Sequence, residues 1–335
     1  MIQEVIHKLV EKNDLTKQEA YECVMEIMSG RATDILISSF LTALRVKGET
    51  ISEIAGCAQA MREMATKIST KEDAVIDTCG TGGDSLGTFN ISTVSAIIAA
   101  SAGARVAKHG NRAVSSKSGS ADVLKVLGVN IEAPKEKLER SLDEIGIAFL
   151  FAPLLHTAMK YAMPVRKELG MRTVFNILGP LTNPAGAKRQ LLGVYRPALT
   201  EILAHVLCEL GTERALVVHG SGGMDEISTT GETQISEIKE GQVTSFTFNP
   251  LSVGLSITEL RHLSGGDSDT NAMIIRSILD GKKGPQRDIA LLNSGAALYV
   301  AGIADTIGDG MRLAGAAVDS GRAKRKLEEL VEYTN

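Results

Sequence analysis

The chain of 335 residues has few cysteines, and they are not arranged as a metal site or a disulfide framework requires. The four cysteines, Cys23, Cys57, Cys79 and Cys208, are widely spread and form no CxxC pair. This pattern argues against a zinc site and against a disulfide scaffold, and it is typical of reduced thiols in a cytosolic protein.

Long apolar runs are also missing. No run approaches the roughly 18 apolar residues that a membrane span needs. The N-terminal stretch carries Glu4, His7 and Lys8 among its apolar residues, so it lacks the apolar core of a signal peptide. We therefore expect a cytoplasmic protein without a membrane partner.

Neither sign of charge dominates the sequence. Lysine and arginine number 36 against 40 aspartate and glutamate, which gives a net charge of −4. A general nucleic-acid binder carries a basic excess, so we expect no nucleic-acid partner. The hydrophobic fraction of 44% and the charged fraction of 23% are ordinary for a globular protein of two domains, or of one large domain with an appendage.

The first part of the chain has apolar residues at helical spacing. Two capping boxes, Thr16–Glu19 and Thr50–Glu53, mark helix starts, and Gly30 and Gly48 stand where helices should stop. Residues 2–68 are therefore predicted to form about four short helices. Because four short helices bury a modest core, this segment should pack against the larger domain or a second subunit.

After Lys71 the pattern changes to apolar strand runs that alternate with amphipathic helices, which is typical of an α/β domain. We expect a small all-helical N-terminal domain, residues 1–70, and a large α/β domain, residues 71–335, with a central, mainly parallel sheet flanked by helices. Residues 151–190 show no convincing strand. A connection this long usually has a role of its own, so we expect its part near 160–190 to return to the helical domain.

A glycine-rich turn, Gly80-Thr-Gly-Gly-Asp84, follows the first predicted strand and leads into a predicted helix beginning near Ile91. A turn of this kind points backbone N–H groups and a helix N-terminus at an anion. It is not a P-loop, because no Gly-Lys-Ser/Thr follows, and it lacks the features of a dinucleotide fingerprint. We interpret it as a phosphate site.

A second polar loop, from Lys108 to Ser120, follows the second predicted strand. It contains three cations, four hydroxyls and two glycines, which suit a phosphorylated ligand. Ligands of α/β sheets bind beyond the carboxyl ends of the strands, where this loop and the glycine loop would lie side by side. Two adjacent phosphate-type loops suggest a substrate with two phosphate centres, such as a bisphosphorylated sugar or a nucleotide.

A third loop, Gly220 to Glu226, follows a predicted strand over residues 215–218 and ends in adjacent carboxylates. Magnesium is commonly held by one or two carboxylates together with substrate phosphates, so Asp225 and Glu226 are candidate metal ligands. His109 is a poor candidate for proton transfer, because a histidine in so polar a loop serves equally as a hydrogen-bond donor.

Five motifs, taken in their order and spacing, resemble the anthranilate phosphoribosyltransferase family over essentially the whole chain. They are Gly80-Thr-Gly-Gly-Asp84, Asn90-Ile-Ser-Thr93, Lys108-His-Gly-Asn-Arg112, Arg172 to Pro184, and Gly223-Met-Asp-Glu226. Pyrimidine nucleoside phosphorylases are similar in fold and in the second loop. The Gly-Pro-Leu-Thr-Asn-Pro segment ending at Pro184 and the Asp225–Glu226 pair match the transferase instead.

The resemblance implies the second step of tryptophan biosynthesis from chorismate. The phosphoribosyl group of 5-phospho-α-D-ribose 1-diphosphate (PRPP) would move to the amine of anthranilate, with diphosphate as the leaving group. The resemblance also implies two Mg²⁺ ions per monomer and a homodimer formed through the helical domain.

The resemblance implies a set of site residues as well. Ser92 and Glu226 would bind one Mg²⁺, and Asp225 and Glu226 the other. Gly80, Asn111 and Arg166 would meet anthranilate, and Lys108, Asn111 and Arg166 would be the catalytic residues. The residues implied to hold PRPP are Gly80, Gly83, Asp84, Thr88, Asn90, Ile91, Ser92, Thr93, Lys108, His109, Gly110, Asn111, Arg112, Ala113, Val114, Ser115, Ser116 and Ser120.

Two other functions are compatible with this fold. A pyrimidine nucleoside phosphorylase would split a nucleoside with inorganic phosphate and would need no paired magnesium carboxylates. A nucleic-acid-binding relative would show a basic face and a steep salt dependence. The net charge of −4 and the Asp225–Glu226 pair favour the transferase over both.

Overall fold

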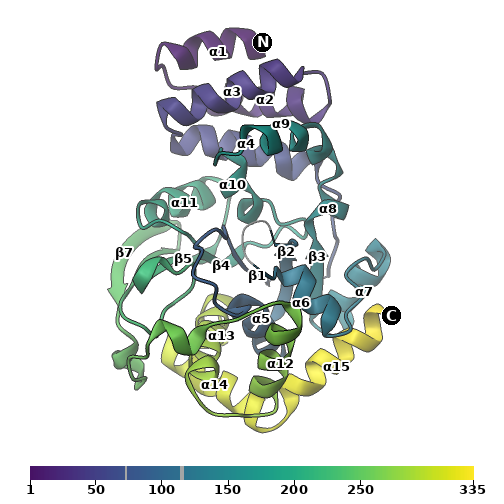
Figure 1. The fold of residues 1–335 in the computed structure, drawn as a ribbon, viewed down its shortest axis with the longest axis vertical. Coiled ribbons are helices and arrows are strands. Elements are labelled where there is room, and N and C mark those ends of the chain that lie inside the picture. Colours follow the sequence, from purple (N-terminus) through teal and green to yellow (C-terminus); the bar gives the residue numbers. More distant parts are fainter. Residues whose placement is uncertain (72–73, 114–116) are drawn as a thin grey trace.

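The computed structural model describes residues 1–71, 74–113 and 117–335. The N-terminal helices form one end of the molecule, and the C-terminus lies on the α/β part (Figure 1). Among the described residues, four helices precede the first strand, as the sequence predicts: α1 (Ile2–Val10), α2 (Lys17–Met28), α3 (Asp34–Lys47) and α4 (Ile51–Met64).

Local sequence explains where these helices begin and end. Thr16 and Thr50 are the N-caps of α2 and α4, and both predicted capping boxes are formed. Gly48 ends α3 with a φ of 93°. The buried carboxylate of Glu53 accepts the Leu15 N–H at 2.8 Å and the Lys47 ammonium at 3.0 Å, which ties three segments of the helical part together.

The described part of the chain forms a sheet of seven strands in the order β3-β2-β1-β4-β5-β6-β7. Strands β1 to β5 are parallel, and β6 and β7 are antiparallel additions, so the predicted, mainly parallel sheet is confirmed. The order of the strands reverses between β1 and β4. A ligand crevice is therefore expected beyond the carboxyl ends of these two strands. The strands are β1 (Val75–Gly80), β2 (Arg105–Gly110), β3 (Ile147–Phe151), β4 (Arg189–Gly193), β5 (Arg214–Gly220), β6 (Thr233–Lys239) and β7 (Gln242–Phe248).

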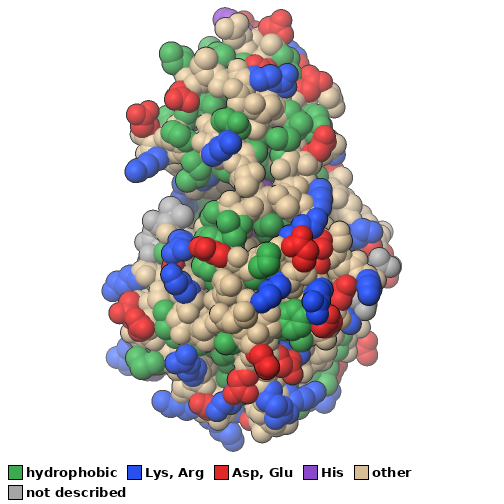
Figure 2. Space-filling model, turned by 90° about the vertical axis from the view of Figure 1, so that its right-hand side faces the viewer, with side chains coloured by type: hydrophobic (Ala, Val, Ile, Leu, Met, Phe, Trp, Pro, Cys, Tyr) green, Lys and Arg blue, Asp and Glu red, His purple; other side chains and the backbone are tan. Residues whose placement is uncertain are grey.

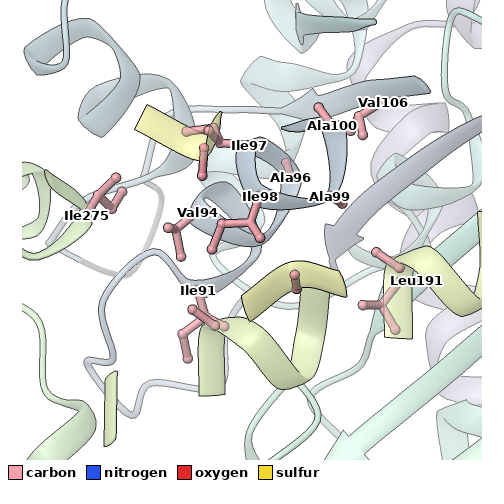
Figure 3. Close-up of a cluster of buried hydrophobic side chains, with 14 of the residues drawn as sticks. Ile91, Val94, Ala96, Ile97, Ile98, Ala99, Ala100, Val106, Leu191 and Ile275 are labelled. Atoms are coloured by element: carbon pink, nitrogen blue, oxygen red, sulfur yellow. The ribbon is translucent and has the colours of Figure 1, made fainter. Parts of the chain in front are cut away.

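One face of the sheet is covered by helices α5 and α13, with the remaining C-terminal helices packed around them. Helix α5 is buried on all sides, and its Ile91, Val94, Ile97 and Ile98 side chains lie within the apolar cluster drawn in Figure 3. This burial fixes the helix whose N-terminus follows the glycine loop. The helices of this face are α5 (Ile91–Ser101), α12 (Ser268–Leu279), α13 (Pro285–Ala301), α14 (Ile307–Asp319) and α15 (Arg322–Thr334).

The other face carries α11 (Ala198–Glu209), which also packs against α4. The connection between β3 and β4, every residue of which is described, contains short helices and 3₁₀ turns without a strand, as predicted. Its helix α9 packs against α3, and its helix α10 packs against α4. Helix α7 (Lys135–Glu144) packs on the same face as α11, against β3 and β2. The remaining short helices are α6 (Ser120–Val126), α8 (Ala152–Leu155), α9 (Met163–Leu169) and α10 (Phe175–Leu178).

Two further observations bear on the sequence predictions. All four cysteines are free thiols. Within the described ranges, no helix is both long enough and apolar enough to cross a membrane. The division into domains at residues 70 and 71 stays a prediction.

Candidate active site

The glycine loop runs from the end of β1 to Asn90 at the start of α5. Gly82 and Gly83 have φ values of 64° and 79°, which a glycine adopts without steric cost. The Thr81 N–H donates to the Gly193 carbonyl at 2.9 Å, and the Gly82 N–H donates to Asp225 Oδ2 at 3.0 Å. The loop after β1 therefore touches both the end of β4 and the loop after β5.

Two glycines allow Asp225 to approach the sheet this closely. A Cβ built on Gly193 would lie 1.6 Å from the Asp225 carbonyl oxygen, and one on Gly80 would lie 2.7 Å from Asp225 Oδ2. Gly80 and Gly193 are register partners on β1 and β4. Their missing side chains leave the space that the Asp225 backbone and carboxylate occupy.

The two adjacent carboxylates are half-buried and close to a third acid. Burial, followed by the negative charge of Asp84, raises the pKa of Asp225 to about 7. Burial and the neighbouring Asp225 raise the pKa of Glu226 well above its usual value. Glu226 Oε1 accepts the Ser92 N–H at 3.0 Å, so this carboxylate reaches the first turn of α5.

These acidic side chains suit a magnesium ion whose remaining coordination positions are filled by oxygens of a bound ligand. Carboxylates held together against their mutual repulsion are stabilised by a divalent cation, and their oxygens are the hard ligands that Mg²⁺ prefers. In the part of the chain that the structure describes, no group of three or more His, Cys, Asp or Glu side chains could hold a metal by itself. Asp225, Glu226 and the Ser92 hydroxyl therefore suit an ion that also takes oxygens from a bound phosphate.

Lys108 is buried, with 3% of its surface exposed, and burial lowers its pKa. Its ammonium donates to Ser92 Oγ at 3.2 Å and to the Thr78 carbonyl, so it lies beside the candidate metal ligands. The negative charge of the fully buried Asp77 acts against this effect, since it is the largest charge that raises the pKa of Lys108. The Asp77 carboxylate also accepts hydrogen bonds from the backbone N–H of His109 at 3.0 Å and from the side-chain amide of Asn183 at 2.7 Å.

Asp77 and Asn183 are not among the site residues predicted from the sequence. An acidic residue directly after an apolar strand run is a signal that could have found Asp77, because an acid buried at the end of a strand needs partners. Asn183 lies in the Gly-Pro-Leu-Thr-Asn-Pro segment. That segment resembles the family, but the resemblance gave no physical role to Asn183. The structure shows that this segment supports Asp77, and through it the strand end that carries Lys108 and His109.

The loop after β2 is closed at its base by Asp122. This carboxylate accepts the Ala113 N–H at 2.9 Å and the Gly119 N–H at 3.0 Å. Asn111 and Arg112 are exposed, and Arg112 lies 3.8 Å from Asp122, so part of its charge is balanced within the protein. The predicted ligand residues Val114, Ser115 and Ser116 lie outside the described residues.

Two buried histidines lie near the end of β2. The rings of His109 and His156 have centroids 5.1 Å apart. Burial lowers the pKa of His109 to about 3 and that of His156 to about 4, so both are neutral at physiological pH. His109 therefore brings no positive charge to a phosphate, and its ring hydrogen-bonds the Gly179 backbone.

A segment of the C-terminal part joins the first two loops, and no sequence pattern predicted this link. The amide of Asn271 on α12 donates to Asn90 Oδ1 at 2.9 Å, and the Asn90 amide donates to the Ser118 carbonyl at 3.1 Å. The Gly265 N–H donates to the Gly87 carbonyl at 2.8 Å. Asn90 is thus held at the junction of the two predicted phosphate loops.

The remaining predicted residues differ in what they can offer a ligand. The side chains of Ile91 and Thr93 are buried with 1% exposure each, so only their backbone atoms could face a substrate. Thr88 forms an isolated bridge with Ser264. Ser120 Oγ donates to the Asn111 carbonyl at 3.3 Å, which ties it to the second loop.

Arg166 on α9 comes from the segment that packs on the helical part. It is half-buried, its guanidinium carbon lies 5.4 Å from the centroid of the Phe175 ring, and burial lowers its pKa. Among the described residues no acidic side chain forms an ion pair with Arg166, whereas its neighbours Lys167 and Glu168 are exposed. A half-buried guanidinium without a carboxylate partner is suited to binding an anionic ligand.

The surface agrees with a site between the two parts. The space-filling view shows a notch where the helical part meets the α/β part, and charges of both signs are interspersed over this face (Figure 2). Among the described residues of this face, no basic stripe is seen of the kind that a nucleic-acid-binding face would carry.

This fold and site define a two-part glycosyl transferase. The helical bundle domain of a glycosyl transferase family matches residues 3–65, and the a/b domain of that family matches residues 72–324. The chain belongs to the anthranilate phosphoribosyltransferase family.

Close relatives of this name span the whole chain. The protein from Acetivibrio thermocellus is 53% identical over 335 residues, which are 100% of this chain and 97% of that relative. The protein from Thermoanaerobacter sp. is 55% identical over 333 residues, which are 99% and 98% of the two chains.

Solved structures agree. The anthranilate phosphoribosyltransferase of Thermus thermophilus has a TM-score of 0.94 at 43% identity and covers 98% of both chains. The Saccharomyces cerevisiae enzyme in complex with PRPP and Mg has a TM-score of 0.90 at 28% identity and covers 99% of this chain and 97% of that one.

Proposed function

We propose that this protein transfers the phosphoribosyl group of PRPP to the amino nitrogen of anthranilate, giving N-(5-phosphoribosyl)anthranilate and diphosphate. This is the second step of tryptophan biosynthesis from chorismate. One observation carries the proposal: the loops after β1 and β5, the end of β2 and the start of α5 meet at one edge of the sheet, with Asp225 bonded to Gly82 and Lys108 bonded to Ser92. Full-length relatives named for this activity, at 53% and 55% identity, support it.

The reaction requires no nucleophile from the protein, because the amine of anthranilate forms the new bond at C1 of the ribose. The protein's part is to position the two substrates and to stabilise the charge of the departing diphosphate. The N–H groups of the glycine loop, the N-terminus of α5 and the Lys108 ammonium are suited to that charge.

Magnesium, when bound, would neutralise charge on the diphosphate. We assign Ser92 and Glu226 to one ion and Asp225 and Glu226 to the other, which gives two ions per monomer. The raised pKa values of both carboxylates support this assignment, since a cation would relieve their repulsion. The Saccharomyces cerevisiae relative, in complex with PRPP and Mg, supports magnesium as the metal.

The substrate contacts are proposed on the same geometry. PRPP would lie across the glycine loop and the loop after β2, and anthranilate would meet Gly80, Asn111 and Arg166 on the side of the helical part. Lys108, Asn111 and Arg166 are the proposed catalytic residues.

The activity is tested by mixing protein, anthranilate, PRPP and MgCl₂ and following the loss of anthranilate fluorescence. We expect loss only when all four components are present. A parallel assay with a pyrimidine nucleoside and inorganic phosphate should release no base. No fluorescence loss, or base release in the second assay, would overturn the proposal.

Replacing Arg166 should weaken the binding of anthranilate far more than the binding of PRPP. In Arg166→Gln the KM for anthranilate is expected to rise about 10- to 100-fold, because a charged hydrogen bond contributes about 1.5–3 kcal/mol. The KM for PRPP should change less than about threefold. Steady-state kinetics with each substrate varied in turn measures both values.

The matched control for Arg166 is Lys167→Gln, the loss of an adjacent but exposed cation. This control should leave both KM values unchanged. If Arg166→Gln and Lys167→Gln behave alike, Arg166 does not contact anthranilate.

We also propose that the helical part forms a homodimer, in a protein that works in the cytoplasm. On this part Ile35, Val46 and Val10 are 78%, 76% and 69% exposed, and such apolar side chains are suited to a subunit interface. Sedimentation equilibrium should give twice the mass of 35.5 kDa. Ile35→Asp should shift the equilibrium to monomer, whereas Ile257→Asp, at an apolar residue of the α/β part that is 50% exposed, should not.

A further inference from the structure

We infer that Arg172 is a positioning residue that, together with Tyr195, clamps the glycine loop in the shape that binds PRPP. The guanidinium of Arg172 donates from Nη2 to the Gly83 carbonyl at 2.7 Å. Its central carbon also lies 3.9 Å from the centroid of the Tyr195 ring. The inference rests on the proposed function for its kinetic consequence, and on these contacts for its structural part.

The contacts form a closed circuit around the loop. The Tyr195 N–H donates to Thr81 Oγ1 at 3.2 Å, so the residue that stacks on Arg172 is itself tied to the loop two residues before Gly83. Arg172 and Tyr195 therefore hold both sides of Gly82. The Gly82 N–H in turn bonds the Asp225 carboxylate at 3.0 Å.

The loop needs such external support because its backbone is not part of a helix or strand. Gly82, Gly83 and Ser85 all have positive φ values, of 64°, 79° and 59°. Among the described residues, Arg172 is the side chain outside the loop that bonds the Gly83 backbone. Asp84 follows directly, and its charge acts on Asp225 and Glu226, so the clamp sets where this third acid stands.

A guanidinium is suited to both contacts at once. Its planar face stacks on an aromatic ring while its edge donates a hydrogen bond in the same plane, which an ammonium cannot do. The guanidinium lies directly against the loop backbone, since a Cβ on Gly83 would lie 3.0 Å from Nη2.

Arg172 also links the loop to the helical part of the molecule. It precedes Val174 and Phe175, which are buried in the same apolar cluster as helices α1 to α4. A shift of this segment would therefore be felt at Gly83. A loop that is already held in its binding conformation loses less entropy when the ligand arrives, so the clamp should act on PRPP affinity.

Two measurements on Arg172→Met test the inference. We expect hydrogen exchange of the Gly82 to Leu86 amides in the ligand-free protein to become at least about tenfold faster. The KM for PRPP should rise at least about tenfold, while kcat and the KM for anthranilate change less than about threefold. Arg172→Lys should give intermediate values, because it keeps a donor and loses the stacking.

The matched control is Arg196→Met. Arg196 lies 5.4 Å from the same Tyr195 ring and carries the same charge, but within the described ranges it makes no hydrogen bond to the loop. It should leave exchange and both KM values unchanged, which separates the clamp from a general loss of positive charge near an anionic substrate. Thermal unfolding of each variant checks that the fold persists.

Unchanged exchange in Arg172→Met would overturn the inference, as would a rise in the KM for anthranilate alone, which would make Arg172 a direct substrate ligand. The exchange experiment uses no substrate. Faster exchange in a protein without transferase activity would therefore contradict the proposed function while supporting the clamp.

Discussion

Replacing Glu226 by glutamine should lower kcat/KM about 10³-fold, and Asp225→Asn should lower it by a comparable factor. Each change removes an anionic oxygen from a site proposed to hold magnesium against the departing diphosphate, and losing one electrostatic stabiliser of that kind costs about 10²- to 10³-fold or more. Initial rates measured over a range of MgCl₂ concentrations should show that half-maximal activity needs more magnesium than in the unmodified protein.

The control for the carboxylates is Glu232→Gln, the same substitution at an exposed residue. It should retain full activity and an unchanged magnesium dependence. Because burial and the negative charge of neighbouring acids raise the pKa values of Asp225 and Glu226, their neutral replacements should fold at least as stably as the parent. An active Glu226→Gln variant with unaltered magnesium dependence would contradict the metal assignment.

Gly193→Ala should lower kcat/KM about 10²-fold or more, although residue 193 touches no proposed substrate position. The new Cβ would lie 1.6 Å from the Asp225 carbonyl oxygen, a contact that only a movement of the backbone can relieve. Overpacking of this kind costs about 1–3 kcal/mol or more of unfolding free energy. A displacement of about 1 Å at the carboxylates costs about 10²-fold in rate.

A graded series tests this explanation. In Gly80→Ala the Cβ would meet the Asp225 carboxylate at 2.7 Å, and a side chain can rotate away, so a smaller loss is expected. In Gly179→Ala the Cβ has no neighbour within 4 Å, and this variant should behave like the parent. The loss of unfolding free energy, measured by chemical denaturation, should rank the three as Gly193, Gly80, Gly179, and any other order would contradict the steric argument.

Much of the fold could be predicted because the signals are local. The capping boxes at Thr16 and Thr50 depend on residues three positions apart, and both are formed. The alternation of strand and helix patterns indicated the parallel sheet, since parallel strands need crossover connections. The three site loops could be recognised for the same reason, because each lies within one continuous stretch after a strand.

The contacts between those stretches could not be predicted from local patterns. Asn183 meets Asp77 across 106 positions of sequence, and Gly82 meets Asp225 across 143. Arg172, in a motif that showed only a family likeness, reaches Gly83 because its segment folds back over the glycine loop. No periodicity or spacing in the sequence indicates that the members of these pairs are in contact.

The sequence by itself determined the glycine loop that follows β1, the cations after β2 and the carboxylates after β5. Each of these features depends only on neighbouring residues, which form the strand, the turn and the charged group in one continuous stretch. The tertiary structure alone decided how they meet. The strand order places β4 between β1 and β5, so Asp225 must cross the end of β4 to reach Gly82, and it can do so only where Gly193 has no side chain. Strand order is set by the packing of the whole core, which no single stretch of sequence contains.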